Sequence, residues 1–123
     1  MWLDRFRTDT SDPREMIARL QHRVFRQAPY VVWTSLRGET VVFDIEHGKY
    51  ESLNEVATSV WERIVAGDQG ATFDSILSAL QEEYELPAES SVDQMATDVA
   101  ALLTRLEKAR TIVSEPLAQV AHS

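Results

Sequence analysis

Residues 44–62 read DIEHGKYESLNEVATSVWE, and the organisation of the whole chain can be worked out from this stretch. The pair His47-Gly48 predicts a turn between two short extended segments. The second segment, from Lys49 to Leu53, leads directly into a helix whose start Asn54 can cap. A strand this short is expected at the edge of a sheet, where its free N–H and C=O groups can pair with an incoming peptide.

The residues before this stretch predict two further strands. Residues 30–36, YVVWTSL, are rich in β-branched and aromatic side chains, which is typical of a strand. Arg37-Gly38-Glu39 predicts a turn, and residues 40–45 predict a second strand. Together with Lys49 to Leu53 they predict an antiparallel meander of three strands joined by tight turns.

Three helices are predicted after the meander. The first begins at Asn54, the second is capped by Thr72 and closed by Pro87, and the third can be capped by Ser90 or Ser91. Their apolar residues recur at helical spacing and predict the buried faces. These residues are Val56, Val60, Trp61 and Ile64 in the first helix, Phe73, Ile76, Leu77 and Leu80 in the second, and Val92, Met95, Ala96, Val99, Leu102, Leu103 and Leu106 in the third.

The two ends of the chain lie outside this arrangement. Residues 1–29 form an extension in which Asp12 can cap a helix that starts at Pro13, and residues 116–123 are expected to be a flexible tail. Apolar residues at helical spacing predict an amphipathic helix over about residues 13–27. They are Met16, Ile17, Leu20, Val24 and Ala28. Their apolar face requires a partner, which is the main domain, a second copy in a homodimer, a modifying enzyme or an anionic membrane surface.

The composition limits the class of protein. A chain of 123 residues with 44% apolar residues suits one globular domain. The absence of cysteine excludes disulfides, thiolate nucleophiles and cysteine metal sites. No apolar run is long enough to span a bilayer, and the charged N-terminus MWLDRFRTD lacks the apolar stretch of a signal peptide. We therefore expect a cytoplasmic protein that does not depend on a membrane.

The charge is distributed unevenly along the chain. Residues 1–37 hold seven arginines against four acidic residues, whereas residues 38–123 hold five lysines and arginines against sixteen acidic residues. An acidic body repels phosphate backbones, because affinity for nucleic acids rests largely on lysine and arginine. This pattern argues against a nucleic acid as the partner.

The sequence contains no set of residues typical of an active site. His22, His47 and His122 are scattered and lack the spacing of metal ligands, so we expect them to be exposed to solvent. There is no nucleophile elbow and no glycine-rich loop that could hold a phosphate. Neither a metal nor a cofactor is therefore expected, and catalysis by this chain alone is not expected.

One string of residues resembles a known family. Its pattern, D-x-x-x-G-x-Y-x-x-L-N-x-x-A-x-x-x-W, resembles that of the PqqD-like proteins, and the resemblance covers roughly residues 31–113. The residues that carry it are Asp44, Gly48, Tyr50, Leu53, Asn54, Ala57 and Trp61. Members of this family are recognition elements that hold the leader peptides of precursors in the biosynthesis of ribosomal peptide natural products.

The resemblance implies both a fold and a function. The fold would be of the α+β class and similar to a winged helix-turn-helix, with a three-stranded antiparallel sheet followed by three helices over residues 30–115 and an extra N-terminal helix. The function would be non-catalytic binding of a leader peptide and its delivery to a maturation enzyme, either a protease of a lasso-type pathway or a radical enzyme. Two alternatives remain, a winged-helix regulator that binds DNA and an adaptor subunit of an unrelated complex.

The resemblance also implies a binding site. In relatives the peptide lies in a cleft between the third strand and the third helix. Asp98 and Arg105 would make polar contacts at its rim, whereas Asn54 and Trp61 are expected to act as a helix cap and a core residue. Spacing alone leaves open which of the other residues are core and which line the cleft. Carried over to this chain, the cleft would be lined by Tyr50, Leu53, Asp98, Val99, Leu102, Arg105 and Leu106. The whole strand Lys49, Tyr50, Glu51, Ser52 and Leu53 would pair with the peptide and so completes the set of peptide-binding residues.

Overall fold

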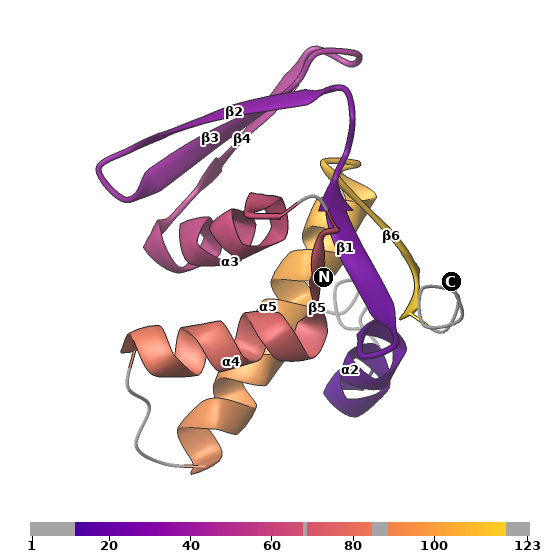
Figure 1. The fold of residues 1–123 in the computed structure, drawn as a ribbon, viewed down its shortest axis with the longest axis vertical. Helices are drawn as coiled ribbons and strands as arrows, with labels where there is room; N and C mark the ends of the chain where they lie inside the picture. Colours follow the sequence, from indigo (N-terminus) through magenta and orange to yellow (C-terminus); the bar gives the residue numbers. More distant parts are fainter. Residues whose placement is uncertain (1–11, 68, 85–88, 118–123) are drawn as a thin grey trace, which may run out of the picture.

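The computed structural model describes residues 12–67, 69–84 and 89–117. Within these ranges the chain forms four helices and two three-stranded antiparallel sheets, with strand orders β2-β3-β4 and β5-β1-β6 (Figure 1). The fold is therefore a mixture of α and β structure with antiparallel pairing. The more specific winged-helix description stays a prediction.

The predicted meander is confirmed as the sheet β2-β3-β4. Strand β2 (Val31–Leu36) pairs with β3 (Glu39–Asp44), and β3 pairs with β4 (Lys49–Leu53). The two-residue turn between β2 and β3 has positive φ at both Arg37 (57°) and Gly38 (81°), which matches the twist of a tight hairpin. Strand β4 comes last in this order and so lies at the edge of the sheet.

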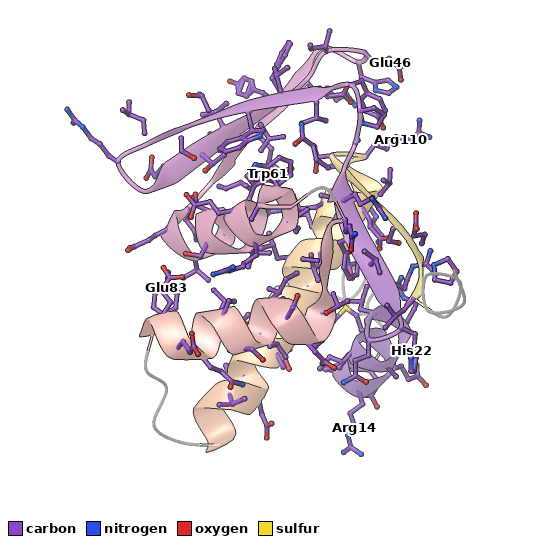
Figure 2. The ribbon with its side chains drawn as sticks, viewed as in Figure 1. Arg14, His22, Glu46, Trp61, Glu83 and Arg110 are labelled. Atoms are coloured by element: carbon purple, nitrogen blue, oxygen red, sulfur yellow. The ribbon has the colours of Figure 1, made fainter. Side chains whose placement is uncertain are left out.

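The two faces of this sheet have different surroundings. Alternate residues of β3, Thr40, Val42 and Asp44, are buried, whereas Val41 and Phe43 are exposed. The buried face covers helix α3 (Glu55–Val65), as Figure 1 shows. Trp61 lies between them, fully buried as predicted, and its ring meets that of Trp33 edge to face at 6.2 Å between centroids (Figure 2). The opposite face of the sheet stays open, and its exposed apolar side chains are Val32, Leu36, Val41, Phe43 and Tyr50.

Helices α4 (Phe73–Tyr84) and α5 (Glu89–Lys108) pack together on the far side of α3 (Figure 1). The predicted cap at Asn54 is confirmed, since its side-chain oxygen accepts a hydrogen bond from the Ala57 N–H at 2.9 Å. Thr72 Oγ1 likewise accepts from the Ser75 N–H at 3.1 Å. Helix α5 begins at Glu89, before the expected caps, because serine can also occupy the interior of a helix and does not by itself set its start.

The prediction of one N-terminal helix over residues 13–27 is wrong beyond Leu20. Helix α2 spans Pro13–Leu20, with Asp12 as its cap, and residues Arg23–Gln27 form strand β1. This strand is the middle one of its sheet, between β5 (Ala71–Thr72) and β6 (Ile112–Pro116). The physical reason is that hydrogen bonds to two distant segments stabilise the extended form, although the apolar residues of this segment also fit helical spacing.

The extension packs against the rest of the chain. Met16, Leu20, Phe25 and Ala28 are buried in the same apolar core as the helices, and α2 contacts α5. The main domain is therefore the partner of the apolar face within residues 12–28. The predicted flexible tail is wrong at Pro116, which pairs with Arg23, because the middle strand β1 offers β6 a free edge. Residues 118–123, including His122, lie outside the described residues.

Gly70 provides a test of the second sheet. Its φ is +81°, and a Cβ atom there would meet the Phe25 carbonyl oxygen and lie 2.8 Å from Arg26 Cγ. We expect Gly70→Ala to lower the free energy of unfolding by about 1–3 kcal/mol, because β1 would have to move away. Gly67→Ala is the matched control, since no atom lies within 4 Å of its added Cβ. Equal stability of the two variants in chemical denaturation would contradict this account of the sheet.

Candidate functional site

Strand β4 has one open edge. It pairs with β3 on one side, and no other described strand pairs with it on the other side. Strand β1, from the N-terminal extension, belongs to the other sheet, so the described part of the extension does not pair with β4. The outward N–H and C=O groups of β4 therefore form a template on which another extended segment can pair.

The side chains of β4 alternate between the two faces of the sheet. Leu53 is 1% exposed and belongs to the core, and the half-buried Glu51 lies on the same face. Tyr50 lies on the opposite, open face and is 71% exposed. Lys49 and Ser52 are exposed as well. The predicted strand residues thus divide into one core residue and four that have surface available to a ligand.

Helix α5 divides the other predicted residues in the same way. Val99 is 2% exposed and Leu106 is fully buried, so both contribute mainly to the core. Leu102 is half-buried, whereas Asp98 and Arg105 are exposed. Val99 and Leu106 anchor α5 in the core, and this packing fixes the position of Leu102, Asp98 and Arg105 on the surface of the helix.

An ion pair joins the strand to the helix. Arg105 Nε lies 2.8 Å from Glu51 Oε2. The Arg105 side chain is 55% exposed, so solvent screens the pair, and an exposed pair of this kind contributes about 0.2–1 kcal/mol. The pair nevertheless shows that Glu51 of β4 and Arg105 of α5 lie side by side. Asp98 accepts a hydrogen bond from Gln94 Nε2 at 3.0 Å on the same helix.

An apolar groove lies between α3 and α5. It has a volume of about 290 Å³ and includes three predicted site residues, Asp98, Val99 and Leu102. Val56 was predicted to be buried but is 39% exposed, because a helical stripe does not show which of its residues a neighbour covers. The remaining residues that line the groove are Val56, Val60, Gln94 and Met95.

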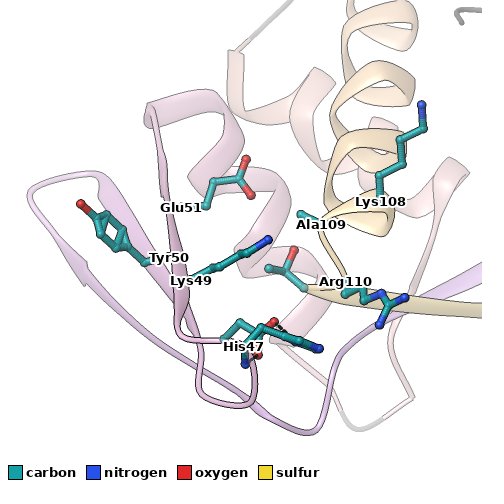
Figure 3. A pocket seen from close by; sticks show the side chains of 9 residues that line it. His47, Lys49, Tyr50, Glu51, Lys108, Ala109 and Arg110 are labelled. Carbon is teal, nitrogen blue, oxygen red and sulfur yellow. Dashed lines mark hydrogen bonds and ion pairs between the residues drawn. The ribbon is translucent and has the colours of Figure 1, made fainter.

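A second cavity, of about 330 Å³, includes the first three residues of β4. Figure 3 shows that side chains from the β3–β4 turn and β4 approach it from one side and those from the end of α5 from the other. Sequence reasoning missed it, since its two halves are separated by more than fifty residues. A positive φ of 67° at Arg110 ends α5 and turns the chain towards β6. We call this cavity the basic pocket; it is lined by Asp44, His47, Lys49, Tyr50, Glu51, Lys108, Ala109, Arg110 and Thr111.

Asp44 and His47 form a local network at the edge of the basic pocket. The buried Asp44 carboxylate accepts from the His47 backbone N–H at 3.0 Å, and its second oxygen lies 2.7 Å from His47 Nδ1. Burial by itself raises the pKa of Asp44, but the two hydrogen bonds and the charge of His47 outweigh burial and lower that pKa. His47 is exposed, as predicted, but its ring also contacts Asp44 and meets Tyr30 edge to face.

Residues 12–67, 69–84 and 89–117 contain no group of three or more histidine, aspartate or glutamate side chains that could hold a metal ion. None of the helices in this part of the chain is both long and apolar enough to cross a bilayer.

The arrangement as a whole is that of a protein with an edge strand available for β-augmentation beside an apolar groove. A family model described as coenzyme PQQ synthesis protein D (PqqD) matches residues 39–112. The chain therefore belongs to the PqqD family, as the residue pattern predicted. The matched region runs from the start of β3 to the start of β6 and includes both sides of the candidate site.

A solved structure shares the fold. It is described as TbiB1 in complex with the TbiA(beta) leader peptide, and it superposes with a TM-score of 0.57 at 21% sequence identity. The match covers 71% of this chain and 93% of that one. No curated protein matches this chain.

The Asp44 network predicts a dependence of stability on pH. Because the pKa of Asp44 is lower in the folded protein than its ordinary value of 3.8, ionised Asp44 stabilises the fold above about pH 4. This contribution is lost as the pH falls through 3.8 towards the lowered pKa. We expect Asp44→Asn to melt below the unmodified protein at pH 7, with a gap that narrows at pH 3. Asp93→Asn, an exposed aspartate, is the control; a gap independent of pH would contradict the assignment.

Proposed function

We propose that this protein binds the leader segment of a ribosomally synthesised precursor peptide by strand addition to β4, without catalysing a reaction itself. The observation that carries the proposal is the edge of β4 with which no other described strand pairs. The ion pair between Glu51 and Arg105 joins β4 to α5, and residues of α5 line both the apolar groove and the basic pocket. Membership of the PqqD family supports it, and so does the shared fold of TbiB1, whose structure contains a leader peptide.

Backbone pairing would supply a large part of the affinity. The five residues of β4 extend over about 17 Å at about 3.4 Å per residue, which is enough for several hydrogen bonds to an added strand. Backbone bonds alone discriminate poorly between sequences, so selectivity requires side-chain contacts. The groove beside Leu102 and Val56 would receive apolar side chains of the leader. The fully buried Leu106 would support this surface from below and not contact the peptide.

The biological advantage of such binding would be an increase in effective concentration. A maturation enzyme that also binds this protein meets the modifiable part of the precursor in a nearly intramolecular encounter. The enzyme would be a protease of a lasso-type pathway or a radical enzyme, and the encounter would take place in the cytoplasm. The exposed apolar face of the sheet and the surface of the N-terminal extension remain available for contact with that enzyme.

Leu102 provides a direct test of the groove. We expect Leu102→Glu to weaken binding of the leader encoded in the same operon by more than tenfold, about 1.4 kcal/mol, because a carboxylate would enter an apolar contact. Ala101→Glu is the matched control, since Ala101 is the neighbouring residue on α5 and is already exposed. Fluorescence anisotropy with a labelled leader measures both. Unchanged affinity of a folded Leu102→Glu protein would remove the groove from the site.

The mode of binding can be tested from the side of the peptide. A strand that pairs with β4 directs every second N–H towards it, so N-methylation of the leader at successive positions should weaken binding at alternate residues. We expect a loss of about tenfold at the sensitive positions and a much smaller loss between them. Isothermal titration calorimetry of the methylated series gives the pattern. Strand addition would be ruled out by losses that lack a period of two.

A further inference from the structure

The basic pocket concentrates positive charge in an acidic protein. Residues 38–123 contain five lysines and arginines against sixteen acidic residues. Three of these five cations, Lys49, Lys108 and Arg110, line this one cavity. They come from two segments that are distant in sequence, because Lys49 belongs to β4, whereas Lys108 is the last residue of α5 and Arg110 lies two residues beyond it. Figure 3 shows Lys49 extending from the strand towards that end of the helix.

The acidic residues of the pocket already have partners. Asp44 is bound by His47 at 2.7 Å, and Glu51 forms its ion pair with Arg105 at 2.8 Å. In the described part of the chain, no carboxylate lies within 4 Å of the charged atoms of Lys49, Lys108 or Arg110. The cavity therefore carries an excess of positive charge that its own acidic side chains do not neutralise.

A purely structural origin explains only part of this cluster. The C-terminal end of a helix carries partial negative charge, which favours cations such as Lys108 and Arg110 in its last turn and just beyond it. Lys49 lies on a strand and receives no such stabilisation from its own element. Its exposed side chain lines the same cavity as two further cations, which repel it. This arrangement suits the binding of an anion.

We propose that the basic pocket binds an acidic side chain of the peptide that pairs with β4. This inference rests on the proposed function, and it adds that the bound peptide must carry an acidic residue. The guanidinium of Arg110 can form paired hydrogen bonds with a carboxylate, and the flexible ammonium groups of Lys49 and Lys108 can approach the same group. The basic pocket includes the first three residues of β4, whereas the apolar groove is lined by residues of α3, which follows β4 in the chain, and of α5. A preferred peptide therefore carries apolar residues and an aspartate or glutamate separated by roughly the length of that strand, about five residues.

Selection from a random library tests both halves of this inference. The probe is an mRNA-displayed library of random sixteen-residue peptides, selected on the unmodified protein and on the triple variant K49Q/K108Q/R110N. Asparagine is chosen at position 110 because it tolerates the positive φ there. The matched control is R14Q/R63Q/R37N, which removes three exposed cations outside both cavities, reaches the same net charge and also replaces an arginine of positive φ.

We expect the selected peptides to carry an acidic residue at a constant distance from apolar residues. Selection on the unmodified protein and on the control should enrich such peptides severalfold, whereas selection on the triple variant should not. Apolar positions without an acidic one, or an acidic preference that the triple variant keeps, would overturn the basic pocket while leaving strand addition intact. Failure to enrich any peptide would overturn strand addition, and with it the pocket.

A second measurement does not depend on the folding of any variant. One selected peptide and its twin, in which glutamine replaces the acidic residue, are titrated against the unmodified protein at low and at high salt. We expect the twin to bind about tenfold more weakly at low salt, and the difference to shrink at high salt, because mobile ions screen the charges. Equal affinity of the two peptides at low salt would overturn the proposal.

Discussion

Among the described residues β4 pairs with β3 on one side and with no strand on the other, and the candidate site depends on this constraint. A strand that is held at one edge and buried through Leu53 is rigid enough to act as a template, while its other edge keeps its hydrogen-bonding groups available. The packing of α3 beneath the sheet, through Trp61, fixes where β4 lies relative to α5. Residues of α5 line the apolar groove together with α3, and the end of α5 lines the basic pocket together with β4.

The second sheet explains how the open edge is preserved. Strand β5 pairs with one edge of β1, and β6 pairs with the other. Neither edge of β1 is therefore free to pair with β4. The described part of the N-terminal extension, residues 12–29, is thereby held in the core through Phe25 and does not pair with β4. The acidic side chains of the basic pocket already have partners, because Asp44 is hydrogen-bonded to His47 and Glu51 is paired with Arg105. Among the described residues, the cations of the basic pocket therefore have no acidic partner within 4 Å.

Much of the fold could be predicted because its signals are local. The meander follows from β-branched segments and short turns, and the cap at Asn54 and the buried Trp61 follow from residue type and spacing. The same local reasoning was wrong for Arg23–Gln27, where helical spacing and strand character coincide in one segment. The family resemblance placed Val99, Leu102 and Leu106 in the cleft. Val99 and Leu102 line the groove, whereas Leu106 is fully buried, because periodicity shows which residues share a face but not how deeply a neighbour covers each of them.

The sequence by itself determined the local elements, the absence of cysteine chemistry, the acidic body and the family pattern, because each of these depends on residues close together or on composition alone. Only the tertiary structure decided that Arg23–Gln27 is a strand and that β4 keeps one edge open. It alone also brought Lys49 into one cavity with Lys108 and Arg110. These features arise from contacts between segments that are distant in the chain, and such contacts leave no periodic signal in the sequence.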